Sequence, residues 1–298
     1  MNAVQQKRIG ILLAVFGVVL FSSKAILVKL AYGYGVDSVS LLLFRMLFAM
    51  PVYIILLLFS KPQKKLQLQQ KEWLWLVFFG FVGYYMASYF DFQGLQYIKA
   101  GLERIVLFVY PTLVLLLSRL VFKTNITKLQ LVAVVCTYVG IIIAFSGELS
   151  FASEDLFLGV GLVFLSAFTY AMYLVGSGWL IPRFGVLRFT CYAMLVSTVC
   201  VFLHYCFTKQ VGLFDYPKEV YFLGVAMAIF STVIPSFLVS QAIKMIGSSN
   251  FAIIGSIGPI STILLANIYL DESFTMLQVL GTIIVILGVF LLSNTKTA

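Results

Sequence analysis

Long apolar runs alternate with short polar segments along the whole chain. Ten of these runs are close to the roughly 20 residues that a helix needs to cross a bilayer. The pattern therefore predicts an all-α integral membrane protein, and the longest polar segment is too short to fold as a separate soluble domain. The predicted transmembrane helices cover residues 9–32, 38–59, 73–92, 101–122, 128–146, 156–180, 186–208, 219–242, 250–270 and 274–293.

Composition agrees with this pattern. The 298 residues are 62% hydrophobic and only 10% charged, whereas soluble domains average about 25% charged residues. The net charge of +9 comes from short basic clusters between apolar runs, so we expect no nucleic-acid partner. The four cysteines lie inside apolar runs without C-x-x-C spacing, and there is a single histidine. We therefore expect no metal site and no cofactor.

The charges of the loops predict the orientation. Cytoplasmic loops of membrane proteins carry an excess of Lys and Arg, and the loops of this chain fall into two alternating sets. The first set, which includes both termini, holds Lys7, Arg8, Lys61, Lys64, Lys65, Lys71, Lys123, Lys128, Arg183, Arg188, Lys244 and Lys296. The second set holds Lys99, Lys209 and Lys218 with Asp37, Glu148, Glu154, Asp155, Asp215, Glu219, Asp271 and Glu272. We expect both termini to be cytoplasmic and the first apolar run to be a retained span, because no small-residue cleavage site ends it.

The chain contains an internal repeat at an offset of 148 residues. The matching residues are the pairs Pro111–Pro259, Gln130–Gln278 and Gly140–Gly288. The two predicted halves, residues 1–148 and 149–298, each hold five spans, and an odd number of spans makes the second copy enter from the opposite side. Inverted repeats around a site near the bilayer midplane are typical of secondary transporters.

Motifs for other activities are absent from the sequence. There is no G-x-x-x-x-G-K-[ST] loop for ATP and no H-E-x-x-H zinc motif. An intramembrane aspartyl protease needs two facing Asp residues, and only Asp91 lies within a predicted span. A serine hydrolase built from Ser256 and His204 is the remaining enzymatic alternative. We predict that the protein is not an enzyme.

Several charged residues lie within the predicted spans, where charges are costly and usually face a bundle interior or a cavity. Lys24 is too deep to reach the interface easily and needs an acidic partner or a substrate. Asp91 and Glu103 either pair with Arg45 or Arg104 as structural ion pairs, or carry a coupling proton.

Tyrosine and serine side chains share faces of two predicted helices. Tyr84, Ser88 and Asp91 are spaced i, i+4 and i+7, and Ser166, Tyr170, Tyr173 and Ser177 also share a face. These faces line a polar cavity or pack between helices with their hydroxyls bonded to backbone carbonyls. The candidate substrate-binding residues are Lys24, Tyr84, Ser88, Asp91, Glu103, Arg104, Tyr110, Tyr170, Tyr173 and Ser256.

Three of the prolines inside predicted spans are candidates for helix interruptions. Pro111 and Pro259 occupy the same place in the two repeats, and Pro235 interrupts the eighth span. Each removes a helical hydrogen bond. We expect these prolines to act as hinges or as static kinks.

Several stretches carry a family resemblance. "YPTLVLLLSRLVF", "LGVGLVFLSAFTYAMYLV" and "GPISTILLANIYLDESFTMLQVLGTIIVILGVFLL" resemble the EamA-type transporters of the drug/metabolite transporter superfamily. The resemblance covers essentially the whole chain. It implies a basket of ten helices around a central cavity, with the fifth and tenth helices peripheral and both termini cytoplasmic. Members of the family export amino acids and other metabolites, and some import them.

Together these features predict a secondary transporter of the bacterial inner membrane. We expect it to move a small polar metabolite with a carboxylate or phosphate group by alternating access, with Lys24 binding the anion and with possible coupling to protons. Export is the expected direction and import by the same fold the alternative. The alternatives from other functional classes are a passive channel and an intramembrane enzyme. The small-xxx-small spacings serve internal packing or an oligomer.

Overall fold

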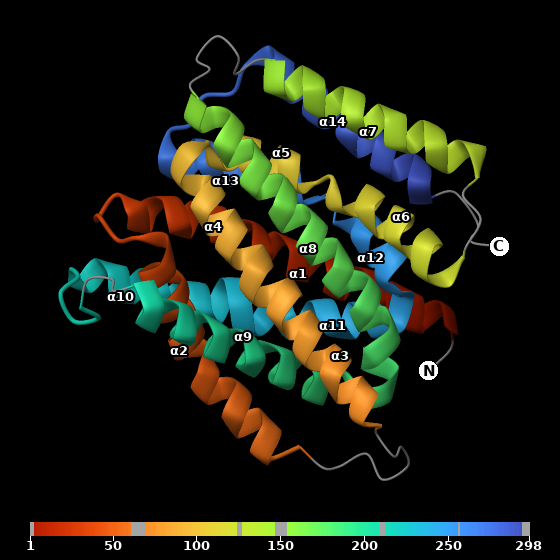
Figure 1. The fold of residues 1–298 in the computed structure, drawn as a ribbon. Helices are drawn as coiled ribbons and strands as arrows, with labels where there is room; N and C mark the ends of the chain where they lie inside the picture. The colour runs from red at the N-terminus through yellow and green to blue at the C-terminus, as the bar shows by residue number, and fades with distance from the viewer. Residues whose placement is uncertain are drawn as a thin grey trace.

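The computed structural model describes residues 3–60, 69–123, 127–146, 154–208, 212–255 and 257–293. All regular structure in these ranges is helical (Figure 1). Eight of the described helical stretches are long and apolar enough to span a membrane. Two shorter apolar helices, Leu131–Ala144 and Met276–Gly288, bring the total to the ten that the sequence predicts.

Six spans are single helices and four are interrupted. The single helices are α1 (Ala3–Tyr32), α2 (Ser38–Leu58), α7 (Lys128–Ser146), α8 (Glu154–Phe184), α9 (Val186–Thr208) and α14 (Met276–Ser293). The third span is α3 (Gln70–Gly80), the π-helical segment η1 (Phe81–Met86) and α4 (Ala87–Tyr97). The fourth span is α5 (Ala100–Leu107) and α6 (Tyr110–Phe122). The eighth span is α10 (Lys218–Ala228), the π-helical segment η3 (Ile229–Val233) and α11 (Ile234–Ile246), and the ninth is α12 (Ser248–Ile254) and α13 (Ile257–Leu270).

The interruptions follow the inverted repeat. The π-helical segments of the third and eighth spans begin at Phe81 and Ile229, which differ by the repeat offset of 148. The breaks in the fourth and ninth spans, after Leu107 and around Gly255, are related in the same way. The sequence indicated only the breaks that carry prolines, because residues 81–86 contain none.

The repeat offset of 148 also relates contacts between the two halves. Adding it to the residue of the first half and subtracting it from the residue of the second half gives another contacting pair. The Ser22 hydroxyl donates to the Gly258 carbonyl at 3.3 Å. The shift of 148 carries this pair onto Tyr170 and Tyr110, whose ring centroids lie 5.3 Å apart. The two inverted halves are therefore related by a pseudo-twofold axis. The predicted boundary at residue 148 lies outside the described residues and stays a prediction.

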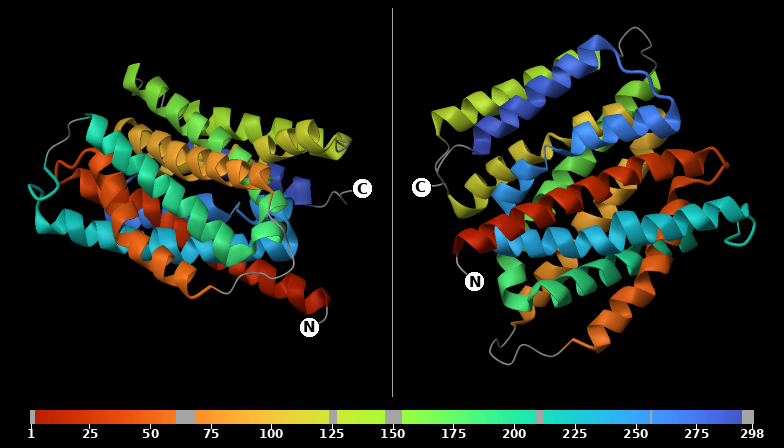
Figure 2. Two further views of the ribbon diagram at one scale, coloured as in Figure 1. Left: turned by 60° about the horizontal axis from the view of Figure 1, so that its bottom comes forward. Right: turned by 180° about the vertical axis from the view of Figure 1, so that it is seen from behind.

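Eight of the spans form a basket, and two pack beside it. In the basket, α1 contacts α11 and α13, α8 contacts α4 and α6, and α2 contacts α9. The pair α7 and α14 lies along one edge (Figures 1 and 2). The fifth and tenth spans are therefore peripheral, as the family resemblance implied.

Glycines allow α7 and α14 to approach closely. A Cβ at Gly281 would contact the carbonyl oxygen of Gly140 and would lie 2.6 Å from the backbone nitrogen of Ala144. A Cβ at Gly288 would lie 3.0 Å from the carbonyl oxygen of Ala133. Helices in lipid associate through such close backbone contacts, because the hydrophobic effect does not drive them together there.

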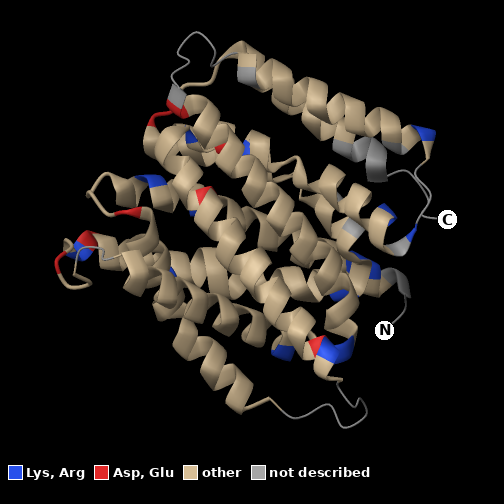
Figure 3. Cartoon of the chain, viewed as in Figure 1, with Lys and Arg blue, Asp and Glu red and all other residues tan. Residues whose placement is uncertain are grey.

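The two ends of the bundle differ in charge (Figure 3). The ends of α1 and α14 nearest the chain termini lie on what we call the basic side, and the opposite end is the acidic side. The described basic residues of the basic side are Lys7, Arg8, Lys71, Lys123, Lys128, Arg183, Arg188 and Lys244. The acidic side holds Asp37, Asp155, Asp215, Glu219, Asp271 and Glu272, with Lys99 and Lys218.

Two contacts tie the halves together at the acidic side. Glu272 accepts hydrogen bonds from the backbone nitrogens of Ala100 at 2.9 Å and Gly101 at 3.1 Å, at the start of α5. The Tyr216 hydroxyl donates to Asp37 at 2.7 Å. Partial burial raises the pKa of Tyr216 to about 12, so its hydroxyl remains a donor at neutral pH.

We expect Gly281→Ala to destabilise the protein by roughly 1–3 kcal/mol, because its methyl group has no room between α7 and α14. The measurement is the thermal unfolding temperature in detergent. Gly161→Ala is the matched control, because nothing lies within 4 Å of a Cβ at that position in α8. Equal unfolding temperatures for the two variants would contradict this account of the helix pair.

Candidate functional site

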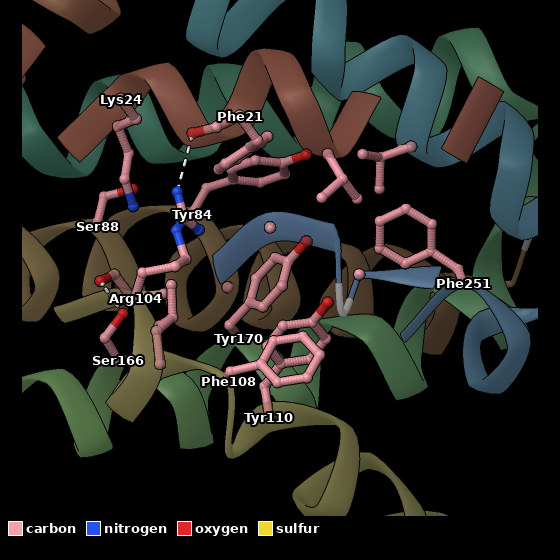
Figure 4. Close-up of a pocket in the computed structure, with 17 residues that line it drawn as sticks. Phe21, Lys24, Tyr84, Ser88, Arg104, Phe108, Tyr110, Ser166, Tyr170 and Phe251 are labelled. Atoms are coloured by element: carbon pink, nitrogen blue, oxygen red, sulfur yellow. Dashed lines mark hydrogen bonds between the residues drawn. The ribbon is translucent and has the colours of Figure 1, made fainter. Parts of the chain in front are cut away.

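A cavity of about 60 Å³ lies at the centre of the basket. Its walls come from both halves, and they include the breaks of the fourth and ninth spans. Lys24, Arg104 and Ser88 gather at one end of the cavity, and Phe251 lies at the other (Figure 4). The cavity therefore has a polar end and an apolar end.

The broken helices bring backbone groups to the cavity. Phe108 and Val109 separate α5 from α6, and Phe108 lines the cavity. In the ninth span, Gly255 and Gly258 line it. The Tyr110 hydroxyl lies so close to Gly255 that a Cβ there would overlap it, so glycine is needed at this point. Discontinuous helices at the interface between repeats commonly form transporter binding sites.

All three predicted hinge prolines lie in the first turn of a helix that follows an interruption. Pro111 is the second residue of α6, Pro235 the second of α11, and Pro259 the third of α13. Proline is well tolerated where a helix begins anew, because the first-turn nitrogens have no helical acceptor. The helix is broken before Pro111 and Pro259, whereas Pro235 follows a π-helical segment in a span that is helical throughout from Lys218 to Ile246. Hinge motion at all three prolines stays a prediction.

Lys24 forms a buried ion pair. Its Nζ lies 2.7 Å from Oδ2 of Asp91, and the two side chains are only 6% and 1% exposed. The residues come from α1 and α4, in the first and third spans. The sequence predicted either an acidic partner or a substrate for Lys24. The structure shows the acidic partner, Asp91, and Lys24 also lines the cavity.

Glu103 and Arg104 continue this charged cluster. Nε of Arg104 lies 3.9 Å from Oε2 of Glu103, and Glu103 is fully buried. Asp91 is buried as well, so two carboxyl groups and the two cations Lys24 and Arg104 form one buried charged cluster.

The two arginines near the cavity have different partners. Nε of Arg104 donates to Thr262 at 2.9 Å, and its Nη2 donates to the carbonyl of Phe21 at 3.2 Å (Figure 4). Arg104 thus joins α5 to α13 and α1. Arg45 donates to Ser88 at 2.9 Å and lies over the ring of Phe92 at 5.1 Å. Its guanidinium holds Ser88, a predicted binding residue, in place.

Tyrosines form the middle of the cavity wall. The ring centroids of Tyr110 and Tyr170 lie 5.3 Å apart, and the Tyr110 hydroxyl donates to the carbonyl of Ala252 at 3.4 Å. The Tyr173 hydroxyl donates to the Tyr84 hydroxyl at 3.2 Å. Tyr84, Tyr110 and Tyr170 line the cavity. Tyr173 is buried between helices, but its hydroxyl bonds the Tyr84 hydroxyl and not a backbone carbonyl as the packing alternative expected.

The structure brings most of the predicted site together. The predicted residues that line the cavity are Lys24, Tyr84, Ser88, Arg104, Tyr110 and Tyr170. Asp91, Glu103 and Tyr173 are buried beside them and contact lining residues. Ser256 lies outside the described residues, although Gly255 and Gly258 on either side of it line the cavity. Their role in binding stays a prediction.

Sequence reasoning did not identify the aromatic part of the wall. Phe21, Phe108 and Phe251 line the cavity, but Phe, Trp and Tyr make up 16% of the chain. No local signal separates these three from phenylalanines that face lipid. The only indication was position, since Phe108 and Phe251 lie near the breaks at Pro111 and Gly255.

His204 has a local structural partner. Its Nδ1 lies 3.0 Å from the Tyr85 hydroxyl, and its ring packs against Tyr89 at 4.8 Å between centroids. In the part of the chain that the structure describes, no group of three or more His, Cys, Asp or Glu residues is arranged to hold a metal ion.

Removing one member of the Lys24–Asp91 pair should leave a buried charge without its partner. We expect Lys24→Met and Asp91→Asn each to cost about 3–5 kcal/mol of stability. The double variant should be more stable than the sum of the single losses predicts. Thermal unfolding of the three variants measures this coupling, with Lys218→Met, an exposed lysine of the acidic side, as the control. Strictly additive losses would show that the pair contributes nothing as a pair.

Comparisons with known proteins agree with the architecture. The model of the EamA-like transporter family matches residues 8–146 and 157–294. The uncharacterized transporter YcbK of Bacillus subtilis (strain 168) is 30% identical over 291 residues, which cover 94% of this chain and 93% of that protein. The uncharacterized inner membrane transporter YicL of Salmonella typhimurium (strain LT2) is 24% identical and covers 75% of this chain and 74% of its own.

A solved structure supports the fold. One crystal structure matches with a TM-score of 0.70 at 14% sequence identity, and the match covers 95% of each chain. The family match comprises two copies of the same module, in agreement with the duplicated halves and the pseudo-twofold contacts. Transporters of this family are not enzymes. The chain is therefore a multi-pass membrane transporter that belongs to the EamA-like transporter family.

Proposed function

We propose that the protein is a secondary transporter that moves a small metabolite with a carboxylate or phosphate group through the central cavity. The observation that carries this proposal is the position of the cavity, where the breaks of two inversely related helices meet. Secondary transporters place their sites at such points near the midplane, where free backbone groups are available to the substrate.

The distribution of charge favours an anion. Lys24 and Arg104 line the cavity, whereas Asp91 and Glu103 do not. An anion in the cavity would therefore meet the two cations first and could form charge-assisted hydrogen bonds with them. It would compete with Asp91 for Lys24. The apolar end at Phe251 favours a metabolite with its charged group at one end, such as an amino acid or another carboxylate.

The size of the cavity implies movement during transport. A volume of about 60 Å³ holds a few water molecules, and a metabolite needs a larger space. The walls must therefore open to admit the substrate. We propose alternating access, with the two halves moving about the breaks at Pro111 and Pro259 and the π-helical segment that precedes Pro235.

We propose that Glu103 carries a coupled proton. Nζ of Lys24 lies 2.7 Å from Asp91, whereas Nε of Arg104 lies 3.9 Å from Glu103. A proton on one of these two carboxyl groups is thus better placed on Glu103, because Lys24 stabilises the ionised form of Asp91.

For the orientation, we propose that the basic side faces the cytoplasm, in agreement with the excess of Lys and Arg in cytoplasmic loops. Both termini would then be cytoplasmic. We propose the bacterial inner membrane as the location, which is also given in the name of the relative YicL. Export is the proposed direction, on the basis of the family resemblance.

The first test is thermal stabilisation of the purified protein by a panel of anions, zwitterions and cations. A ligand that binds only the folded state adds about 2.7 kcal/mol to the free energy of unfolding at 100 times its Kd, and this raises the unfolding temperature. We expect carboxylates or phosphates to stabilise the protein, and Lys24→Ala and Arg104→Ala to lose this effect. Arg188→Ala, which removes a cation of α9 outside the cavity, should keep it.

Two outcomes would overturn the proposed substrate class. Stabilisation by cations or neutral aromatic compounds would make Lys24 and Arg104 structural. A Lys24→Ala variant that is correctly inserted and transports normally would remove Lys24 from the binding site. Proteoliposome flux without saturation or counterflow would indicate a passive channel instead of a transporter.

Flux in proteoliposomes also tests the proton proposal. With the stabilising compound as substrate, an imposed pH gradient should change the uptake rate of the original protein. We expect Glu103→Gln to respond at least tenfold less to the gradient while keeping the ligand-induced thermal shift, because glutamine has the same shape but cannot lose a proton. Asp155→Asn, on the exposed acidic side, is the control. An unchanged response of Glu103→Gln would exclude Glu103 as the carrier.

A further inference from the structure

A second, larger cavity lies on the outer surface of the basket. It is a groove of about 460 Å³ between α3 and α6, with α8 as its floor. Figure 1 shows α8 between these two helices. Trp75 and Phe79 form one wall, Leu117 and Val121 the other, and Gly176 and Trp179 lie in the floor. All of its lining residues are apolar.

The groove opens toward the lipid. Trp75 is 45% exposed, Trp179 39% and Val121 62%. In an apolar solvent such a groove does not remain empty, because unfilled space forfeits dispersion contacts along its whole lining. The indole N–H groups of Trp75 and Trp179 are the side-chain hydrogen-bond donors of this lining, and its other side chains offer no hydrogen bond to a polar substrate. A hydrocarbon chain is the group that matches it.

The end of the groove on the basic side is surrounded by cations. Each of the three helices carries a basic residue within four positions beyond its last lining residue. These are Lys71 four residues before Trp75, Lys123 two residues after Val121, and Arg183 four residues after Trp179. All three basic side chains are exposed.

One acidic group lies in this region. Glu72 forms an ion pair with Arg183, with Oε1 3.3 Å from Nε, and its Oε2 accepts a hydrogen bond from the backbone nitrogen of Gln69 at 2.9 Å. It therefore offsets Arg183 and also caps α3. Lys71 and Lys123 then leave two positive charges at the mouth of the groove. Trp75 and Trp179 are placed near the interface, where tryptophan is enriched in membrane proteins.

We propose that this groove binds one acyl chain of an anionic phospholipid, whose headgroup phosphate contacts Lys71 and Lys123. The floor from Met172 to Trp179 is about 10 Å long at 1.5 Å per residue, so it holds the part of the chain nearest the headgroup. Basic pockets between membrane helices bind anionic headgroups. The site does not depend on the transported substrate or on the direction of transport.

The test compares phosphatidylglycerol with phosphatidylcholine of the same chain length. Each lipid is added to the full chain purified in detergent, and thermal unfolding and native mass spectrometry report stabilisation and retained lipid. We expect phosphatidylglycerol to bind more tightly. The double variant Lys71→Gln/Lys123→Gln should weaken it about 30-fold, at about fivefold for each lysine. Binding of phosphatidylcholine should weaken much less, because its choline cation already offsets the charge of its phosphate.

Two further variants separate the headgroup from the chain. Lys244→Gln removes an exposed lysine of the basic side on α11, a helix that does not line the groove, and should bind phosphatidylglycerol normally. Val121→Trp narrows the groove and should reduce the retention of both lipids. Because Val121 is mostly exposed, this substitution should not prevent folding.

Three results would overturn the proposal. One is equal stabilisation by the two lipids. Another is equal loss in Lys244→Gln and in the double lysine variant. The third is efficient cysteine crosslinking between two copies through Val121→Cys, with a dimer mass and no retained lipid, which would assign the groove to a second copy of this chain.

Discussion

The absence of water in the bilayer core is the constraint on which this structure depends. A backbone group without a partner costs several kcal/mol in lipid, so an interrupted helix is tolerated only where protein or a cavity surrounds it. The breaks after Leu107 and around Gly255 meet this condition, since both lie at the central cavity. At these breaks side chains supply partners for backbone groups, since the Ser22 hydroxyl donates to the Gly258 carbonyl and the Tyr110 hydroxyl donates to the Ala252 carbonyl.

The charged side chains obey the same constraint in a different way. Lys24 and Asp91 form an ion pair at 2.7 Å, and Arg104 is held by hydrogen bonds to Thr262 and to the carbonyl of Phe21. Because the cations line the cavity and the carboxylates are buried beside them, the cluster is balanced in formal charge yet presents positive charge to the cavity. In the proposed mechanism, an anion would act on this network by displacing Asp91 and a proton by neutralising a carboxylate.

The inverted repeat explains why the centre is symmetric in backbone and asymmetric in chemistry. The π-helical segments beginning at Phe81 and Ile229 are related by the repeat offset, and so are the helix breaks. The acidic residues Asp91 and Glu103, however, fall on Val239 and Phe251 in the second half. Backbone geometry was retained in both copies, because it sets how the halves pack, whereas one copy is sufficient to supply the charges.

The sequence by itself determined the ten spans, their inverted duplication and the charged residues within them, because span length, periodicity and the cost of charge in lipid are local properties. It did not determine which partner Lys24 takes, since Asp91 lies on another helix and the choice depends on how α1 and α4 pack. Nor did it separate Phe108 from phenylalanines that face lipid. Only the tertiary structure decided these points, and the outer groove with them, because each depends on the distances between helices that are far apart in the chain.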